Sequence, residues 1–296
     1  LPQALAVEVF HNFTLVHDDI MDRADVRRNT PTVHKKWDDN VAILSGDGMM
    51  VLAYQLLAET KPEHLSTLFK IFSATALEVC EGQQYDMDLA HSEEVFMPQY
   101  IEMIRLKTGV LLGYSMELGA MLAGASEEDV ANCYNSGEKM GLSFQIMDDL
   151  LDAFGEKALV GKQIGGDILA DKKTILSLLA FQSANSDYED VLKMQNPEEK
   201  VSAMLKVYEN TGARQETENL MKQYDVAKVN LFKMYDDYKN FDKNMVDKFI
   251  NMYNHYPEES EAEITNYIKK LDSKKEKKEG EKEENGKKAP PPARHN

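Results

Sequence analysis

The chain of 296 residues carries the pattern Asp-Asp-x-x-Asp twice, at Asp18, Asp19 and Asp22 and at Asp148, Asp149 and Asp152. Both patterns lie in apolar surroundings that favour helices, and positions three and four apart share one helix face. Three carboxylates on a partly buried face repel one another unless a cation joins them. Aspartates without Cys or His favour a hard ion such as Mg²⁺, which completes its shell with water and phosphate oxygens. The two clusters therefore predict a clamp for magnesium and a diphosphate.

Basic residues follow each aspartate cluster and lie between the two. An arginine fork grips phosphate oxygens with two hydrogen bonds, and a glycine-rich stretch lets the backbone come close to a ligand. The candidate phosphate-binding cations are Arg27, Arg28, Lys107, Lys162 and Lys172, and Thr108 adds a hydroxyl beside Lys107.

A solvated helix face is the competing interpretation of each cluster, because the chain has 51 acidic residues. That interpretation would be favoured for one cluster alone. Two clusters of identical spacing, each followed by a basic loop, favour the metal site.

Six blocks of this sequence resemble the trans-isoprenyl diphosphate synthases of the polyprenyl synthetase family. The blocks are Phe13–Asp22 with Arg27, Arg28 and Pro31–His34, then Gly46 and Asp47, Glu81–Gln83, Lys107 and Thr108, Phe144–Asp152, and Gly161 and Lys162 with Asp167 and Lys172. The likeness covers roughly residues 1 to 270.

Two features depart from the family pattern. Asn29 stands where the family usually has glycine, and asparagine tolerates the left-handed backbone that such a position requires. The family also carries an upstream Gly-Gly-Lys-Arg segment that holds the homoallylic diphosphate, whereas this chain starts at Leu1 within the helix that leads to Asp18. We therefore expect the sequence to be N-terminally incomplete.

The resemblance implies an all-α fold, a single-domain bundle of long helices around a central active-site cavity. It implies an ionisation-first condensation of isopentenyl diphosphate with an allylic diphosphate, with three Mg²⁺ ions and all six aspartates at the metal site. The roles that it implies are neutralisation of the leaving diphosphate by Arg27, Lys107 and Lys162, substrate binding by Arg28 and Lys172, and stabilisation of the allylic cation by Thr108 and Gln145. A homodimer is implied as well.

Product length is expected to depend on the helix that carries Asp18, because this helix lines an apolar tunnel in the family. Phe13 and Phe10 lie about one and two turns before Asp18 and project in similar directions, beside the small Thr14. This pattern favours geranylgeranyl diphosphate as the product, with farnesyl diphosphate next.

Three alternative classes of protein compete with the prenyl synthases. A class I terpene cyclase shares one Asp-Asp-x-x-Asp motif but normally replaces the second. A non-catalytic regulatory subunit of a prenyl synthase generally loses aspartates that this chain retains, and only the missing upstream segment favours it. A di-iron bundle would need Glu-x-x-His pairs that face one another.

Composition excludes several other classes. The formal net charge of −17 argues against nucleic acid and anionic lipid as partners. Cys80 and Cys133 are the two cysteines and imply no disulfide framework, which favours a cytoplasmic location. We also expect no apolar stretch of the roughly 18 to 20 residues that cross a bilayer.

Periodicity predicts helices throughout and no strand, with one catalytic domain over residues 1–271 and a disordered, charged tail over 272–296. The first expected helix ends at about Asp22. The next helices are expected over Val41–Thr60, Glu63–Asp88, Met97–Lys107, Thr108–Ala123, Ser126–Asp152 and Thr174–Ser183. Two further helices are expected to start at Asn196 and after Gly212, and two shorter ones to span Phe241–Tyr253 and Glu258–Leu271.

Overall fold

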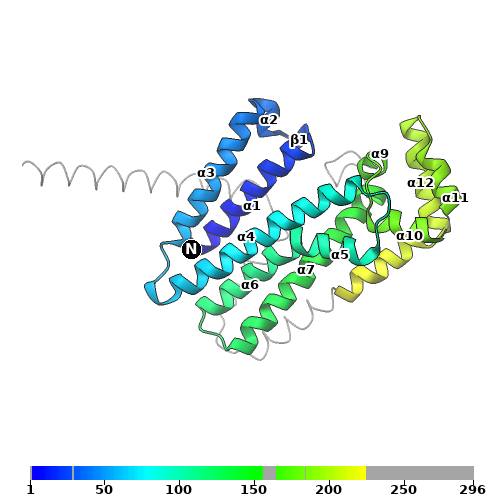
Figure 1. Cartoon of the computed structure of the whole chain (residues 1–296). Helices are drawn as coiled ribbons and strands as arrows, with labels where there is room; N and C mark the ends of the chain where they lie inside the picture. Colours follow the sequence, from blue (N-terminus) through cyan, green and yellow to red (C-terminus); the bar gives the residue numbers. More distant parts are fainter. Residues whose placement is uncertain (1, 29, 156–164, 184, 225–296) are drawn as a thin grey trace, which may run out of the picture. The chain divides into compact units, whose positions relative to one another are not determined.

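The computed structural model describes residues 2–28, 30–155, 165–183 and 185–224, which all belong to one unit, Leu1–Asp237. The expected tail, the helices expected beyond residue 224, and Asn29 and Lys162 lie outside the described residues. The elements are α1 (Pro2–Met21), β1 (Val26–Arg27), β2 (Thr30–Pro31), α2 (Val33–Lys36), α3 (Asp39–Leu57), α4 (Pro62–His91), α5 (Met97–Ile104), a π-helical turn η1 (Arg105–Gly109), α6 (Val110–Leu122), α7 (Glu127–Phe154), α9 (Gly166–Leu169), α10 (Ile175–Ser183), α11 (Asn185–Leu192) and α12 (Pro197–Asn210), followed by a helix over 213–224 (Figure 1). The expected all-α fold is confirmed.

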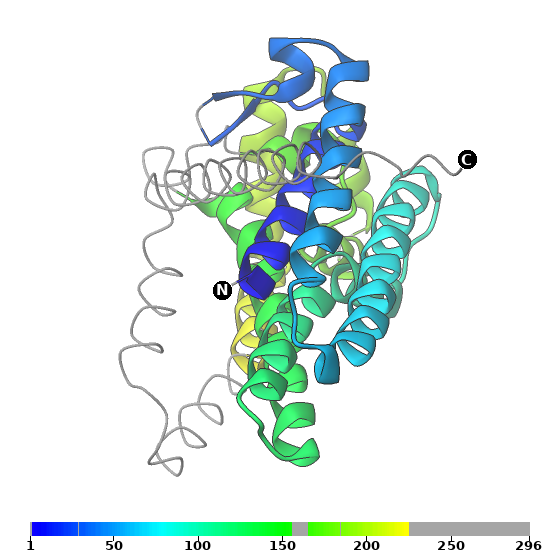
Figure 2. The ribbon, with the colours of Figure 1, turned by 90° about the vertical axis from the view of Figure 1, so that its left-hand side faces the viewer.

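Helices α1 and α3 run antiparallel side by side, as both ribbon views show (Figure 2). They come close because Gly46 has no side chain: a Cβ there would lie 2.3 Å from Nε2 of His17. The His17 ring packs on Phe13 with 4.8 Å between centroids, and its Nε2 lies 3.2 Å from the carbonyl oxygen of Ile43. Gly46 therefore sets the distance between the first aspartate helix and its neighbour.

Helices α6 and α7 also pack closely against one another, again at glycines. A Cβ on Gly137 would lie 2.5 Å from the carbonyl oxygen of Leu112, and one on Gly141 would lie 2.6 Å from the Cα of Gly109. Any side chain at these glycines would force the backbones apart. The close packing places η1 directly against the helix that carries the second aspartate cluster.

Several helix ends agree with the sequence. The Ser126 hydroxyl accepts from the amide of Asp129 and begins α7, and the Asn196 side chain caps α12 ahead of Pro197. Gly212 takes a left-handed φ of 74° and separates α12 from the next helix.

Other expectations about the elements are wrong. The segment before residue 41, expected as a loop, contains α2 and the antiparallel pair β1–β2, in which Val26 faces Pro31. These elements are too short to show a periodic signal, as are α9 and α11. The expected break between Lys107 and Thr108 is the π-helical turn η1, which joins α5 to α6 without interruption.

The expectation about membrane spans also needs correction. Helix α3, with 19 residues and a mean hydropathy of 1.2 over its best window, meets the length and composition of a spanning helix. It carries only two charged residues, Asp39 and Asp47. Core helices of proteins outside membranes meet the same criterion, so it is weak evidence.

Candidate functional site

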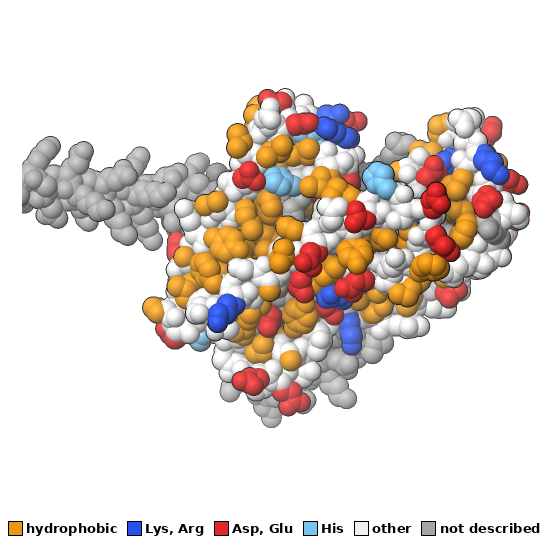
Figure 3. Space-filling model, in the orientation of Figure 1, with side chains coloured by type: hydrophobic (Ala, Val, Ile, Leu, Met, Phe, Trp, Pro, Cys, Tyr) orange, Lys and Arg blue, Asp and Glu red, His pale blue; other side chains and the backbone are white. Residues whose placement is uncertain are grey.

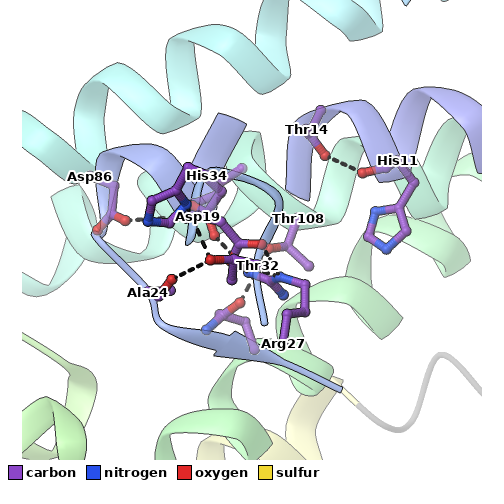
Figure 4. Close-up of polar contacts among 12 residues, drawn as sticks. His11, Thr14, Asp19, Ala24, Arg27, Thr32, His34, Asp86 and Thr108 are labelled. Carbon is purple, nitrogen blue, oxygen red and sulfur yellow. Dashed lines mark hydrogen bonds and ion pairs between the residues drawn. The ribbon is translucent and has the colours of Figure 1, made fainter. Parts of the chain in front are cut away.

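The first aspartate cluster lies at the end of α1, and its middle member faces the protein. Asp19 is 4% exposed, and its two carboxylate oxygens accept from Nε of Arg27 at 2.8 and 2.9 Å (Figure 4). A terminal nitrogen of Arg27 also donates to Asp18 at 3.2 Å. Burial raises the pKa of Asp19, although the guanidinium of Arg27 opposes the shift. Asp22 is exposed. The outer aspartates of this cluster are thus more accessible than the central one.

The loop that presents Arg27 is held at its base by side-chain hydrogen bonds. Thr32 is buried and donates from its hydroxyl to the carbonyl oxygen of Ala24 at 2.7 Å, and its amide donates to Asp25 at 3.1 Å (Figure 4). Because that hydroxyl has one proton, Nδ1 of His34, 3.2 Å away, must donate to it. Arg28 is exposed at the tip with a left-handed φ of 50°.

Lys107 joins the first cluster to the helix α4. Its ammonium lies 2.9 Å from Asp18 and 2.7 Å from Asp86, and these carboxylates raise the pKa of Lys107 against the opposing effect of burial. Asp86 was not predicted as a site residue from the sequence. It lies four residues after Gly82 and so shares that residue's face of α4. Lys107, Asp18 and Asp86 form one charge network across three elements.

The geometry of η1 allows this network to form. A π-turn inserts an extra residue into a helix and reorients the side chains within it. A Cβ on Gly82 would lie 2.2 Å from the amide nitrogen of Lys107, so α4 touches the backbone of the turn itself.

The second cluster, on α7, repeats the pattern of the first. Asp149 is 5% exposed and accepts from the hydroxyl of Tyr100 and from the amide of Ile175. Burial raises the pKa of Asp149 to about 7. Asp148 is partly exposed, and Asp152 accepts from the amide of Asp167 at 3.0 Å. The central aspartate again faces protein donors, and Tyr100 is a second residue that the sequence reasoning missed.

Thr108 and Gln145, both expected to stabilise the allylic cation, contact one another. The Thr108 hydroxyl donates to the Gln145 side-chain oxygen at 3.2 Å, and the Gln145 amide group lies 3.5 Å from Asp149. These contacts connect η1 to α7 beside the second cluster.

Lys172 connects the two clusters electrostatically. The carboxylates that act on it are those of Asp86, Asp167, Asp22 and Asp149, and together they raise its pKa although burial opposes the shift. Asp22 belongs to the first cluster and Asp149 to the second. Carboxylates of both clusters therefore act on one cation.

The rings of Phe10 and Phe13, on the helix that carries the first cluster, contact one another at a tilt of 52°, with 5.5 Å between ring centroids. Phe10 is fully buried, and its ring meets Phe72 of α4 at 5.2 Å. Phe72 in turn contacts Tyr54 at 5.0 Å and Tyr114 at 5.7 Å. The tunnel floor expected from α1 is thus backed by aromatic rings from three other helices.

The donor set fits Mg²⁺ better than a softer metal, because both clusters offer carboxylate oxygens. Within the described residues, no three His, Cys, Asp or Glu side chains gather closely enough to hold a metal by themselves. Mg²⁺ commonly takes only one or two carboxylates and completes its shell with substrate phosphates.

Comparisons with known proteins agree with this site. The geranylgeranyl diphosphate synthase of Methanosarcina mazei is 41% identical over 184 residues, which cover 62% of this chain and 57% of that protein. A solved geranylgeranyl pyrophosphate synthase has a TM-score of 0.75 at 42% identity and covers 78% of this chain and 74% of the other. The Corynebacterium glutamicum synthase, solved with isoprenyl diphosphate and magnesium, has a TM-score of 0.69 at 28% identity and covers 76% and 71%.

The chain thus spans less than two thirds of the length of the Methanosarcina relative. Residues 1–211 match the polyprenyl synthetase family. These residues contain both aspartate clusters, Lys107 and Lys172. The chain belongs to the polyprenyl synthetase family.

Proposed function

We propose that this protein is a Mg²⁺-dependent trans-prenyltransferase that condenses isopentenyl diphosphate with an allylic diphosphate. One observation carries the proposal: the Lys107 ammonium bridges Asp18 of the first cluster to Asp86 of α4, at 2.9 and 2.7 Å. A diphosphate with its magnesium ions is the ligand that suits alternating carboxylates and ammonium groups. The complex of the Corynebacterium relative with isoprenyl diphosphate and magnesium supports this choice.

We assign the metal-ligand role mainly to the outer aspartates. Asp18, Asp22, Asp148 and Asp152 would hold the magnesium, up to three ions by family analogy, whose charge would stabilise the leaving diphosphate. Asp19 and Asp149, the buried members at 4% and 5% exposure, accept hydrogen bonds from protein donors and would orient their neighbours.

The cations and polar side chains take separate roles in the reaction. Arg27, Lys107 and Lys162 neutralise the leaving diphosphate, and Lys172 binds it. Ionisation breaks the carbon–oxygen bond of the allylic diphosphate, and the double bond of isopentenyl diphosphate, which Arg28 holds, forms the new carbon–carbon bond. The Thr108 and Gln145 oxygens face the cation, and the departed diphosphate accepts the proton that leaves.

We propose geranylgeranyl diphosphate as the main product, with farnesyl diphosphate next. The half-buried ring of Phe13 and the fully buried ring of Phe10 support a short product, because they fill the space below Asp18. The names of the relatives point the same way.

A homodimer is the assembly that we propose. Apolar side chains are exposed on α3 and α4, where Figure 3 shows hydrophobic atoms gathered. Leu44 is 71% exposed, Val51 59% and Leu77 61%. Apolar exposure of this kind marks association surfaces.

The unpaired Cys80 and Cys133 support a cytoplasmic location.

The test is an incubation of the purified protein with isopentenyl diphosphate, an allylic diphosphate and Mg²⁺, with products separated by chromatography. We expect prenyl diphosphates of up to twenty carbons, and their loss in excess EDTA. Product formation that continues without a divalent cation would overturn the proposal. Sedimentation velocity on the same sample tests the dimer, and a Leu44→Glu variant should shift it to the monomer.

A further inference from the structure

Lys200 is a buried lysine far from both aspartate clusters in sequence. It lies on α12, is 7% exposed, and is the one lysine or arginine that is buried among the described residues. Its ammonium lies 2.6 Å from Oδ1 of Asp171. A buried ammonium is costly unless it is paired. The carboxylate of Asp171 therefore supplies the charge that compensates the buried ammonium of Lys200.

Asp171 has an unusual backbone conformation. Its φ of 51° is left-handed, a region that non-glycine residues rarely adopt. Such a conformation is strained and persists where the surroundings hold it. The ion pair with Lys200 is the contact in this structure that holds the side chain of Asp171.

The left-handed residue directly precedes Lys172. The turn closes with the amide of Asp171 donating to Ile168 at 3.3 Å and the amide of Lys172 donating to Asp167 at 2.9 Å. The amide of Thr174 then donates to Lys172 at 3.0 Å. A change in the conformation of Asp171 would redirect the chain directly before Lys172.

A second contact shows that α12 is docked on this loop independently of the ion pair. A Cβ on Gly165 would lie 2.8 Å from Cγ2 of Val201, the residue that follows Lys200. Loss of the Lys200 charge would therefore leave the helix in place and remove only the constraint on Asp171.

We propose that Lys200 is a positioning residue for Lys172: by binding Asp171 it holds the left-handed turn from which Lys172 extends. The inference rests on the proposed function, because it treats Lys172 as a diphosphate-binding cation. Lys200 itself reaches no substrate; it acts through the turn.

The experiment measures binding of inorganic diphosphate in the presence of Mg²⁺ by calorimetry. Lys200→Met should weaken binding about tenfold, and Lys200→Arg, which keeps the charge, should recover most of the loss. Lys206→Met is the matched control, because Lys206 is exposed on the same helix. The decisive variant combines Lys172→Met with Lys200→Met. If Lys200 acts through Lys172, the double variant binds no more weakly than Lys172→Met alone.

Hydrogen exchange supplies a readout that does not depend on activity. The amides of Lys172 and Thr174 should exchange faster in Lys200→Met, while those of α12 stay protected. A Lys200→Met variant with wild-type affinity, or losses that add in the double variant, would overturn the inference. If Lys200→Met unfolds, Asp171→Asn removes the half-exposed partner of the ion pair instead; the same loss of affinity is expected there, and wild-type affinity in Asp171→Asn would overturn the inference. Failure of the wild type to bind diphosphate would instead refute the proposed function.

Discussion

Gly82 and Lys107 lie backbone to backbone, so closely that a Cβ on Gly82 would stand 2.2 Å from the amide nitrogen of Lys107. This contact between α4 and η1 places the Lys107 ammonium within 2.9 Å of Asp18 and 2.7 Å of Asp86. The glycine therefore determines how closely the π-turn packs against α4.

Gly82→Ala should consequently lower kcat by on the order of 10²-fold, the usual effect of a misplaced charge-stabilising donor. Helix propensity alone favours alanine over glycine by about 1 kcal/mol, so a loss of stability or activity would reflect the contact with the turn. Gly119→Ala is the control, because a Cβ there meets nothing within 4 Å and should leave kcat unchanged. Steady-state kinetics and thermal unfolding of both variants decide the question, and equal kcat in the two would show the contact to be unimportant.

Asp18 and Asp19 should respond differently to removal of their charge. Asp18→Asn should reduce kcat by about 10² to 10³-fold and raise the Mg²⁺ concentration needed for half-maximal rate, as loss of a metal ligand does. Asp19→Asn should leave Arg27 without its two-point acceptor and chiefly lower stability, by about 1–3 kcal/mol. Titration of activity with Mg²⁺ and urea unfolding separate the two effects. A larger metal requirement for Asp19→Asn than for Asp18→Asn would contradict the assignment.

Tyr100→Phe should destabilise the fold by about 1–3 kcal/mol, because it removes a donor from the buried Asp149. Tyr85→Phe on α4 is the control, since Tyr85 is 43% exposed. The measurement is the midpoint of chemical unfolding for each variant. Identical midpoints would mean that the hydroxyl of Tyr100 is replaceable by water.

Phe13→Ala should shift the products to longer chains, and Phe13→Ala with Phe10→Ala should shift them further. The ring centroids of Phe72 and Phe10 are 5.2 Å apart, so elongation of the prenyl chain should stop at Phe72 unless that residue is also replaced. Thr14→Phe should shorten the product. Chromatography of the prenyl chains reports the lengths, and an unchanged profile in the double alanine variant would place the floor elsewhere.

Tyr114→Phe is the matched control for these aromatic substitutions. Its hydroxyl is buried and has no hydrogen-bond partner in the described part of the chain. Removal of an unpaired buried hydroxyl should be neutral or slightly stabilising. Product length should stay as in the wild type, because the ring of Tyr114 remains.

The sequence by itself determined the helical class, the ends of α7 and α12, and the two aspartate clusters with the cations that follow them. These features are local: periodicity, caps and motif spacing are all set by residues a few positions apart. The Asp-Asp-x-x-Asp spacing showed that the members of a cluster lie near one another. It did not show which member faces the protein.

That choice belongs to the tertiary structure. Asp149 meets Tyr100, 49 residues away, and Lys107 meets Asp18, 89 residues away. Asp86 and Lys200 likewise acquire their roles only where helices distant in sequence pack together. Such contacts depend on interhelical distances, which glycines such as Gly82 and Gly46 set through close backbone approach, and no local pattern in the sequence records those distances.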